Sequence, residues 1–205
     1  MRDSEGFDLW ADKYDDHVKQ YEREGGYPFA GYGKVHGRIL CRVTAKKNAA
    51  VLDLGFGTGT LTARLYDAGC EVFGQDFSKK MLEAAAAKMP GAKLYLGDLK
   101  DGLAEPLRGL TFDFIISTYA LHHLTDPQKV SLLRELRGRL REGGAILVGD
   151  VSFPDAAARE ACRLAAGDEW DTDEYYAAYD ELARELPGLR FERVSLCAGI
   201  MTLEK

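Results

Sequence analysis

Residues 51–59 read VLDLGFGTG, an apolar run that ends in three glycines at alternate positions, Gly55, Gly57 and Gly59. The apolar run is typical of a buried parallel strand, and the glycines predict a tight turn that exposes backbone N–H groups before the next helix. In doubly wound α/β proteins such a turn lies at the carboxyl edge of the sheet and faces a nucleotide-type cofactor. The stretch therefore predicts an α/β fold with a cofactor loop at this point of the chain.

The glycine spacing argues against a dinucleotide cofactor. The dinucleotide fingerprint is G-x-G-x-x-G, whereas the glycines here follow G-x-G-x-G, and Asp53 lies two residues before the first of them. A carboxylate at that place would repel a phosphate and attract a cation. The stretch resembles motif I of the class I S-adenosylmethionine-dependent methyltransferases. The cofactor of that family carries an ammonium, a carboxylate and a sulfonium group but no phosphate.

Acidic residues follow the next two predicted strands. Residues 71–76 read EVFGQD and predict a strand that ends in Asp76. An acid about 20 residues beyond the first glycines accepts hydrogen bonds from ribose hydroxyls in doubly wound folds. The alternative is that Asp76 only caps the helix that opens near Ser78. Phe77, beside it, could cover one face of an adenine.

The third predicted strand, residues 92–96, is followed by Gly97, Asp98 and Leu99. The Asp98 carboxylate can accept from an exocyclic amine, and the Leu99 backbone N–H can donate to a ring nitrogen. The resemblance places this G-D-L at the adenine-recognition position. It implies cofactor contacts from Tyr14, Asp53, Leu54, Gly55, Gly57, Gly59, Asp76, Phe77, Asp98, Leu99 and Ser117.

A pair of histidines follows the fourth predicted strand. Residues 112–117 read FDFIIS, and the chain continues TYALHHL to residue 124. A histidine has an unperturbed pKa near 6.5 and can serve as a general base. We expect His122 to take that role if the acceptor is a hydroxyl or a protonated amine, whereas a thiolate acceptor needs no base. The alternative is that the histidines only pack or bond to a backbone carbonyl.

The first 48 residues predict an N-terminal helical lid. Their apolar stripe is Phe7, Trp10, Tyr14, Val18 and Tyr21, at helical spacing, and a second helix is predicted over 32–43. Residues 10–15, WADKYD, resemble the W-A-x-x-Y-D segment that opens many small-molecule methyltransferases, whose tyrosine lies near the methyl donor. We expect Tyr14 and Tyr32 to point into the site. The alternative is a helix docked on the core.

The second half of the chain predicts a further helix from residue 126, a strand over 145–151, and a helical insertion over 152–187 near the substrate pocket. The segment LREGGAILVGD, residues 140–150, resembles the L-K-P-G-G segment of the family. Within the insertion we predict helices over 155–166 and 172–186. Asp171 and Glu174 have the spacing of a capping box at the start of the second of these helices. Tyr176 lies off its apolar stripe and is expected on the surface, or in contact with substrate.

Residues 189–196 and 199–204 predict two closing strands, which their short connection makes antiparallel. A terminal antiparallel hairpin separates the methyltransferase variant from the dinucleotide fold. The expected fold is a doubly wound, three-layer, Rossmann-like single domain over residues 1–205. Its sheet is mostly parallel and seven-stranded, and it ends in the C-terminal hairpin.

Composition limits the other possibilities. The 205 residues include 33 acidic and 27 basic residues, a net charge of −6, which argues against a nucleic-acid substrate. The four cysteines form no C-x-x-C pair, so no metal site or redox motif is predicted. No apolar stretch reaches the roughly 20 residues of a membrane helix, and residues 1–5 do not have the layout of a signal peptide. We expect a cytoplasmic protein, monomeric or homodimeric.

The resemblance implies methyl transfer from S-adenosylmethionine to a small-molecule acceptor, with S-adenosylhomocysteine as product. The chain has no N-P-P-Y or D-P-P-Y after its fourth strand and no Pro-Cys pair, which argues against methylation of nucleic-acid bases. Two alternatives stay open at this stage. One is a non-catalytic protein that binds S-adenosylmethionine or S-adenosylhomocysteine, and the other is a nicotinamide-dependent oxidoreductase.

Overall fold

The structure of the chain is a computed structural model that describes residues 26–205. The expected N-terminal helix, Tyr14 included, lies outside the described residues. The second predicted helix is α2 (Tyr32–Thr44), which begins at the residue expected. Its buried face, with Val35 and Ile39, packs into the core.

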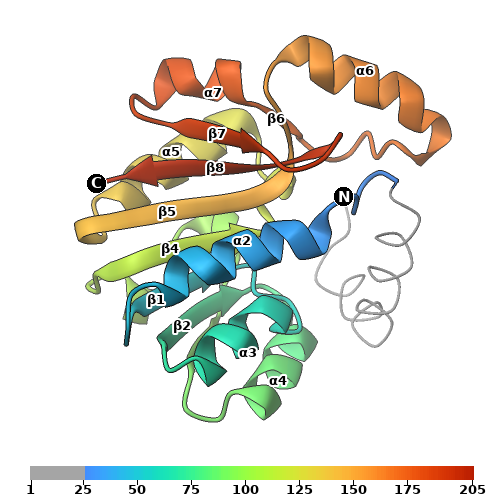
Figure 1. Cartoon of the computed structure of the whole chain (residues 1–205). Helices are drawn as coiled ribbons and strands as arrows, with labels where there is room; N and C mark the ends of the chain where they lie inside the picture. Colours follow the sequence, from blue (N-terminus) through green and yellow to red (C-terminus); the bar gives the residue numbers. More distant parts are fainter. Residues whose placement is uncertain (1–25) are drawn as a thin grey trace.

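One sheet of eight strands organises the described part of the chain (Figure 1). Its order is β3-β2-β1-β4-β5-β8-β7, with the short β6 paired to β5. All pairs from β3 to β5 are parallel, whereas β8 is antiparallel to both β5 and β7. The predicted fold class is therefore confirmed, and β6 is an addition to it. The strands are β1 (Ala50–Leu54), β2 (Glu71–Asp76), β3 (Lys93–Leu96), β4 (Phe112–Thr118), β5 (Leu140–Phe153), β6 (Ala177–Ala178), β7 (Arg190–Arg193) and β8 (Ala198–Glu204).

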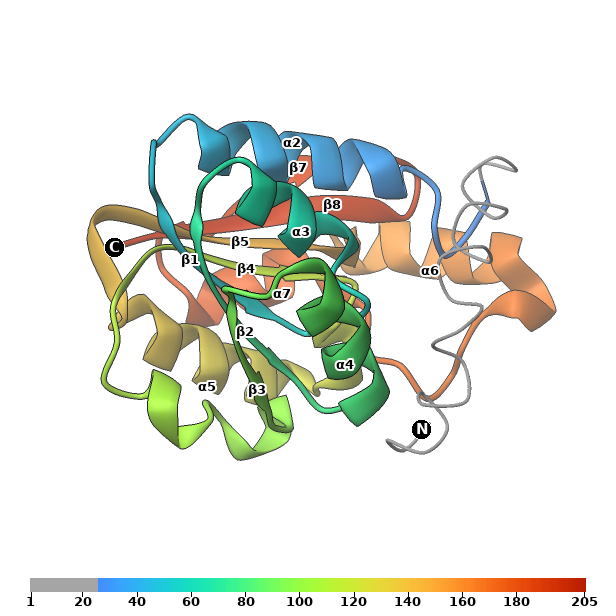
Figure 2. The same cartoon turned by 90° about the horizontal axis from the view of Figure 1, so that it is seen from below.

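Helices cover both faces of the sheet and complete the three layers (Figure 2). Alternate side chains of a strand point to opposite faces. Accordingly, Val51 joins the apolar cluster that α2, α3 (Thr60–Asp67) and α4 (Lys79–Lys88) also build. Its neighbour Leu52 joins the cluster on the side of α5 (Asp126–Arg137) and α7 (Tyr179–Glu185). Among the helices of the described region, none has the length and apolar character needed to span a lipid bilayer.

The predicted helix over 172–186 is wrong in its first half. Residues 177–178 form β6, which pairs with the end of β5, and α7 begins only at Tyr179. Asp171 does not cap a helix, because its carboxylate accepts a hydrogen bond from Asp173 N at 2.8 Å in a local turn. Tertiary contacts of residues 174–178 outweigh the weak local preference for helix. The helix before this segment, α6 (Ala156–Ala166), agrees with its prediction and is followed by η4 (Gly167–Glu169).

The loops after β1, β2, β3 and β4 meet at one edge of the sheet. The chain runs from β1 to β2 and β3 on one side, and then returns to β4 and β5 on the other. The crevice at this change of direction is the usual ligand position in doubly wound sheets. Short 3-10 helices lie after two of these strands, η1 (Leu99–Asp101) after β3 and η3 (Leu121–His123) after β4. A third, η2 (Glu105–Leu107), lies on the connection to β4.

Candidate active site

The glycine-rich turn after β1 is built for close backbone contact. Gly55 has a φ of 75°, and a Cβ atom there would lie 2.4 Å from the Cβ of Ala120. Any larger residue would therefore push the turn away from the segment that follows β4. Gly55 N donates to Gln75 O at 2.7 Å, which ties the turn to the neighbouring strand β2.

Asp76 holds the same turn from the end of β2. Its carboxylate accepts from Gly57 N at 2.8 Å and from Ser78 N at 2.9 Å, and the side chain is buried. Ser78, not Asp76, is the N-cap of α4, because its hydroxyl accepts from Met81 N. The two backbone donors fix the Asp76 carboxylate beside the glycine turn, where it lies on the wall of a cavity.

A cavity opens between the loops that follow the first four strands. It contains about 990 Å³ of empty space, part of which is open to solvent. Six of the predicted cofactor residues line it, and so does Tyr32: the six are Gly55, Gly57, Asp76, Phe77, Asp98 and Leu99. The structure thus brings together the acids that follow β2 and β3 with the glycine turn.

Four predicted cofactor residues in the described chain lie behind the cavity wall instead. Asp53, Leu54, Gly59 and Ser117 are not among its lining residues. The Ser117 hydroxyl donates to Leu54 O at 2.7 Å and joins β4 to β1. Gly59 is the N-cap residue of α3.

Asp53 is a buried carboxylate with one unsatisfied oxygen. Its Oδ2 accepts from the Thr62 hydroxyl at 2.6 Å, whereas Oδ1 has no hydrogen-bond partner among the described residues. Burial raises the pKa of Asp53 to about 7, and the Thr62 hydrogen bond opposes that rise. A positive charge bound nearby would favour the ionised form.

His36 is a cavity residue that the sequence analysis did not single out. It lies one helical turn after Tyr32 on α2, and the two rings are 4.0 Å apart. Its Nε2 is buried and lacks a hydrogen-bond partner among the described residues. Burial lowers its pKa to about 4, so the imidazole is neutral at pH 7. The spacing of four from Tyr32 on a predicted helix was the available signal, since residues at i and i+4 share a face.

The other end of the cavity is formed by residues 118–124. Thr118, Tyr119, Ala120, His123 and Leu124 all line it. Tyr119 has a φ of 51°, which is uncommon for a residue other than glycine and turns the chain sharply out of β4. Its ring lies 4.9 Å from that of Tyr32, so an aromatic wall faces the cavity.

His122 does not line the cavity, although His123 does. The Nδ1 atom of His122 lies 2.6 Å from Asp150 Oδ1, and Asp150 Oδ2 accepts from His122 N at 3.1 Å. Burial disfavours the imidazolium, but the Asp150 carboxylate outweighs that effect and the pKa of His122 is raised. Because an ionised carboxylate only accepts hydrogen bonds, we assign the Nδ1 proton to this contact. The Nε2 atom is then the one available for chemistry.

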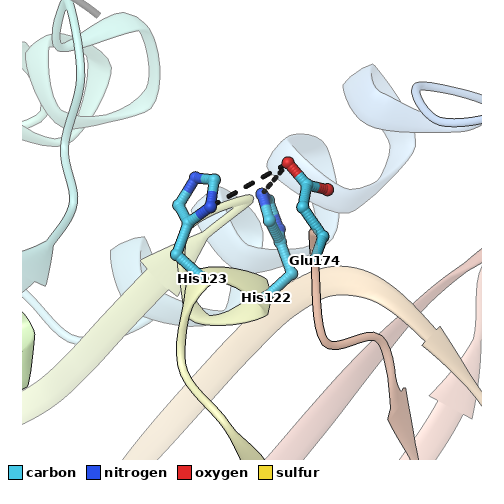
Figure 3. Close-up of side chains that lie close together, drawn as sticks. All are labelled: His122, His123 and Glu174. Carbon is cyan, nitrogen blue, oxygen red and sulfur yellow. Dashed lines mark ion pairs between the residues drawn. The ribbon is translucent and has the colours of Figure 1, made fainter. Parts of the chain in front are cut away.

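Glu174 lies opposite the two histidines (Figure 3). Its Oε1 is 3.6 Å from His122 Nε2 and 3.9 Å from His123 Nδ1. Burial, and after it the charge on His122, lower the pKa of His123 to about 3. His122, His123 and Glu174 form a group whose ligand atoms could hold a metal ion.

The segment with Glu174 is anchored onto η3 and α5. Tyr175 N donates to His122 O at 2.8 Å, and Lys129 Nζ donates to Tyr175 O at 2.5 Å. The buried Lys129 also pairs with Asp126 at 2.7 Å. These contacts explain why residues 174–176 do not form the predicted helix.

Tyr176 is buried, so its expected surface position is wrong. Its hydroxyl donates to Glu174 Oε2 at 2.5 Å and also contacts the Tyr27 hydroxyl. Its ring lies edge-on to Trp170, with centroids 4.7 Å apart. The ring packs against another aromatic side chain and the buried hydroxyl has hydrogen-bond partners, so the residue is stable in the protein interior.

Fold and cavity together define a class of protein: a doubly wound α/β domain whose glycine turn and strand-end acids face one cavity. A family model described as a methyltransferase domain matches residues 51–144. An uncharacterized methyltransferase of Geobacillus kaustophilus is 37% identical over 179 residues, covering 87% of this chain and 79% of that protein. An uncharacterized methyltransferase of Geobacillus thermodenitrificans is 38% identical over 86% of this chain and 83% of its own length.

Solved methyltransferase structures share the fold. The DhpI–SAH complex has a TM-score of 0.71 at 18% identity, covering 97% of this chain and 93% of that one. The magnesium protoporphyrin IX methyltransferase of Synechocystis with bound SAH has a TM-score of 0.67 at 18% identity, covering 95% and 97%. The chain belongs to the class I S-adenosylmethionine-dependent methyltransferases, and S-adenosylmethionine is its methyl donor.

Proposed function

We propose that the protein transfers the methyl group of S-adenosylmethionine in line to a small-molecule acceptor in the cavity beside residues 118–124. The observation that carries this proposal is the cavity itself. One end of it has the glycine turn, Asp76 and Asp98, and the other has the aromatic wall and His123. Donor and acceptor can therefore be held in one enclosed space, which supplies the alignment that methyl transfer requires.

The nucleoside part of the donor is assigned to the loops after β2 and β3. Asp76 lines the cavity, and its carboxylate would accept hydrogen bonds from the ribose hydroxyls. Asp98 and the Leu99 N–H would bind the adenine edge, and Phe77 would cover one of its faces. The remaining predicted residues, Leu54, Gly59 and Ser117, would shape the loop from behind.

The methionine part is assigned to the glycine turn, where two buried side chains suit its charges. Asp53 is buried behind the turn, not on the cavity wall, so its carboxylate would favour the ammonium and sulfonium groups through its charge and not by direct contact. His36 Nε2 is a buried, unsatisfied nitrogen on the wall of the cavity and can donate to the carboxylate. Buried polar groups are normally satisfied, so His36 Nε2 fits a ligand that completes it.

The acceptor end favours a compact substrate. Tyr32 and Tyr119 give it apolar faces that exclude water, and the chain as a whole carries a net charge of −6. When bound, S-adenosylmethionine supplies an activated methyl group on a sulfonium. Removal of water from the nucleophile favours its reaction with such a cation, because charge is neutralised as the bond forms.

His122 is proposed to assist removal of the acceptor's proton. Because it does not line the cavity, we assign it a positioning role: it acts at Nε2, through its neighbours Glu174 and His123. Asp150 fixes the ring and keeps the proton on Nδ1.

The proposal is tested by calorimetry with S-adenosylmethionine on the intact chain, together with a methyl-consumption assay across a panel of small metabolites. Asp76→Ala should weaken donor binding by roughly 1–3 kcal/mol, because charged hydrogen bonds are lost. Glu185→Gln changes an exposed carboxylate on α7 and is the matched control. An unchanged dissociation constant in Asp76→Ala would show that the ribose assignment is wrong. Donor binding without methyl consumption for any metabolite would contradict the small-molecule proposal.

A further inference from the structure

His122, His123 and Glu174 bring three metal-ligating atoms together at the edge of the cavity. The atoms are His122 Nε2, His123 Nδ1 and Glu174 Oε1, all within 4.8 Å of one another. Figure 3 shows the two rings and the carboxylate pointing toward a common centre. We propose that this cluster binds a divalent transition-metal ion, with Zn²⁺ the ion it suits best. The cysteine pattern of the sequence predicted no such site, because none of its ligands is a cysteine.

In two of the three ligands, the atom that does not face the centre is already hydrogen-bonded. His122 Nδ1 is bonded to Asp150, which itself accepts from the backbone N–H groups of His122 and Val151. Glu174 Oε2 accepts from the Tyr176 hydroxyl. Metal-binding histidines and carboxylates are oriented in this way by a second set of hydrogen bonds. The structure therefore leaves Nε2 and Oε1 facing each other.

The separations suit a small ion. Zinc binds histidine nitrogen and carboxylate oxygen at about 2.0–2.2 Å, so neighbouring ligand atoms of a tetrahedral site lie about 3.3–3.5 Å apart. The two distances from Glu174 Oε1, 3.6 and 3.9 Å, exceed that by a few tenths of an ångström. The third separation, between the two imidazole nitrogens, is no more than 4.8 Å, and rotation of the rings on metal binding would shorten it.

The donor set selects the type of ion. Two imidazoles and one carboxylate suit zinc and its first-row neighbours, whereas Mg²⁺ and Ca²⁺ prefer oxygen ligands. The Glu174 and Asp150 carboxylates also supply the negative charge that a divalent ion needs. Lys129, the nearby buried cation, is paired with Asp126 and the Tyr175 carbonyl.

Three protein ligands leave a fourth coordination position, as in catalytic zinc sites. His123 lines the cavity, so that position would serve the acceptor end. Resting on the proposed function, we assign it to a hydroxyl or thiol of the acceptor. The ion would stabilise the deprotonated form of that group and its proton would pass to solvent, so His122 would assist proton removal as a ligand of the ion. Methyl transfer then forms a bond from that oxygen or sulfur to the methyl carbon. The carbon–sulfur bond of the donor breaks, and its electron pair stays on the donor sulfur.

Metal binding is tested on the full-length protein after treatment with a chelator. Titration with Co²⁺ should give the visible absorption of a four-coordinate site, and Zn²⁺ should displace it with one equivalent. Glu174→Gln keeps an acceptor for Tyr176 and removes a charged ligand, so it should weaken Zn²⁺ binding by about 100-fold or more. Asp150→Asn, which disturbs only the orientation of His122, should weaken it by roughly 10- to 100-fold.

Glu185→Gln is the matched control, because it neutralises an exposed carboxylate that belongs neither to the cluster nor to the cavity wall. Its Zn²⁺ affinity should equal that of the unmodified protein. Calorimetry with S-adenosylmethionine on every variant verifies folding without using the metal. A protein that binds S-adenosylmethionine but no Zn²⁺ would overturn the metal site and leave the proposed function standing. Zn²⁺ binding that is indifferent to Glu174→Gln would overturn it equally.

The acceptor role is tested separately with a small thiol, 2-mercaptoethanol, added to the Co²⁺-loaded protein. A new near-ultraviolet band from cobalt–sulfur charge transfer is expected if the fourth position is open to the cavity. An unchanged spectrum would retract the acceptor role and leave the metal site in place. A protein that binds metal and thiol but no S-adenosylmethionine would instead contradict the proposed function.

Discussion

The two ends of the cavity are assembled in different ways. At the donor end, the glycine turn, Asp76 and Asp98 follow three consecutive strands, all within residues 50–99. At the acceptor end, residues 118–123 meet Asp150 on β5 and Glu174, which lies some 50 positions further along the chain than His122. Tyr27, from before the first strand, completes the network through Tyr176.

The donor end is built from short sequence motifs, whereas the acceptor end is built from residues that only the tertiary fold brings together. Each donor-end residue lies where its own strand ends, so a short sequence motif is enough to predict its position. The acceptor-end residues come from separate segments of the chain, so no single sequence motif includes them all. Donor-end variants should therefore change binding of S-adenosylmethionine, and acceptor-end variants should change turnover.

The largest expected effect is at the acceptor end. His122→Ala should lower kcat by about 100- to 10,000-fold, the usual contribution of proton-transfer groups. The dissociation constant for S-adenosylmethionine should stay within about twofold, because His122 does not line the cavity. The pH profile of kcat, which a merely structural role would not alter, should lose one ionisation. Equal turnover, or a parallel loss of donor affinity, would break the distinction between the two ends.

A second pair of variants probes a close contact between the ends. Gly55→Ala places a methyl group 2.4 Å from Ala120 and imposes a φ of 75° on a side chain. The unfolding free energy should fall by about 2–4 kcal/mol, the sum of a left-handed backbone and overpacking. Gly57→Ala also has a positive φ, but its added methyl group meets nothing within 4 Å. It should cost about 1–2 kcal/mol. Equal losses in denaturant titrations would show that the contact with Ala120 is unimportant.

The smallest expected effect concerns Asp53. Its pKa is raised to about 7, so below that pH the Asp53 carboxyl is mostly protonated. Binding of the cationic donor favours the ionised carboxylate, so Asp53 should release a proton when the donor binds at lower pH. Affinity for S-adenosylmethionine should therefore rise as pH increases toward 7 and level off above it, by at most about 1.4 kcal/mol per pH unit. Calorimetry in buffers of different ionisation enthalpy measures the released proton directly. Asp53→Asn should bind more weakly and lose this pH dependence; a slope that persists in the variant would assign the proton to another group.

Much of the fold was predictable because periodicity and breakers are local signals. The strand predicted over 71–76 is β2 to the residue, and the helix predicted to open near Ser78 is α4, which begins at Lys79. Prediction was weakest over residues 171–178, where Tyr175 and Lys129 dock the chain onto η3 and α5. A capping pattern there competes with contacts to residues about 50 positions away, and those contacts prevail.

The sequence by itself determined the class of enzyme and the donor end of its site. An apolar strand, a glycine turn and acids at strand ends are each encoded over a few residues, and their geometry follows from parallel pairing. Only the tertiary structure decided that Glu174 faces His122 and His123, that Asp150 orients His122, and that Tyr176 is buried. Those positions depend on how distant segments pack, because buried polar atoms take whichever partners the fold brings within reach.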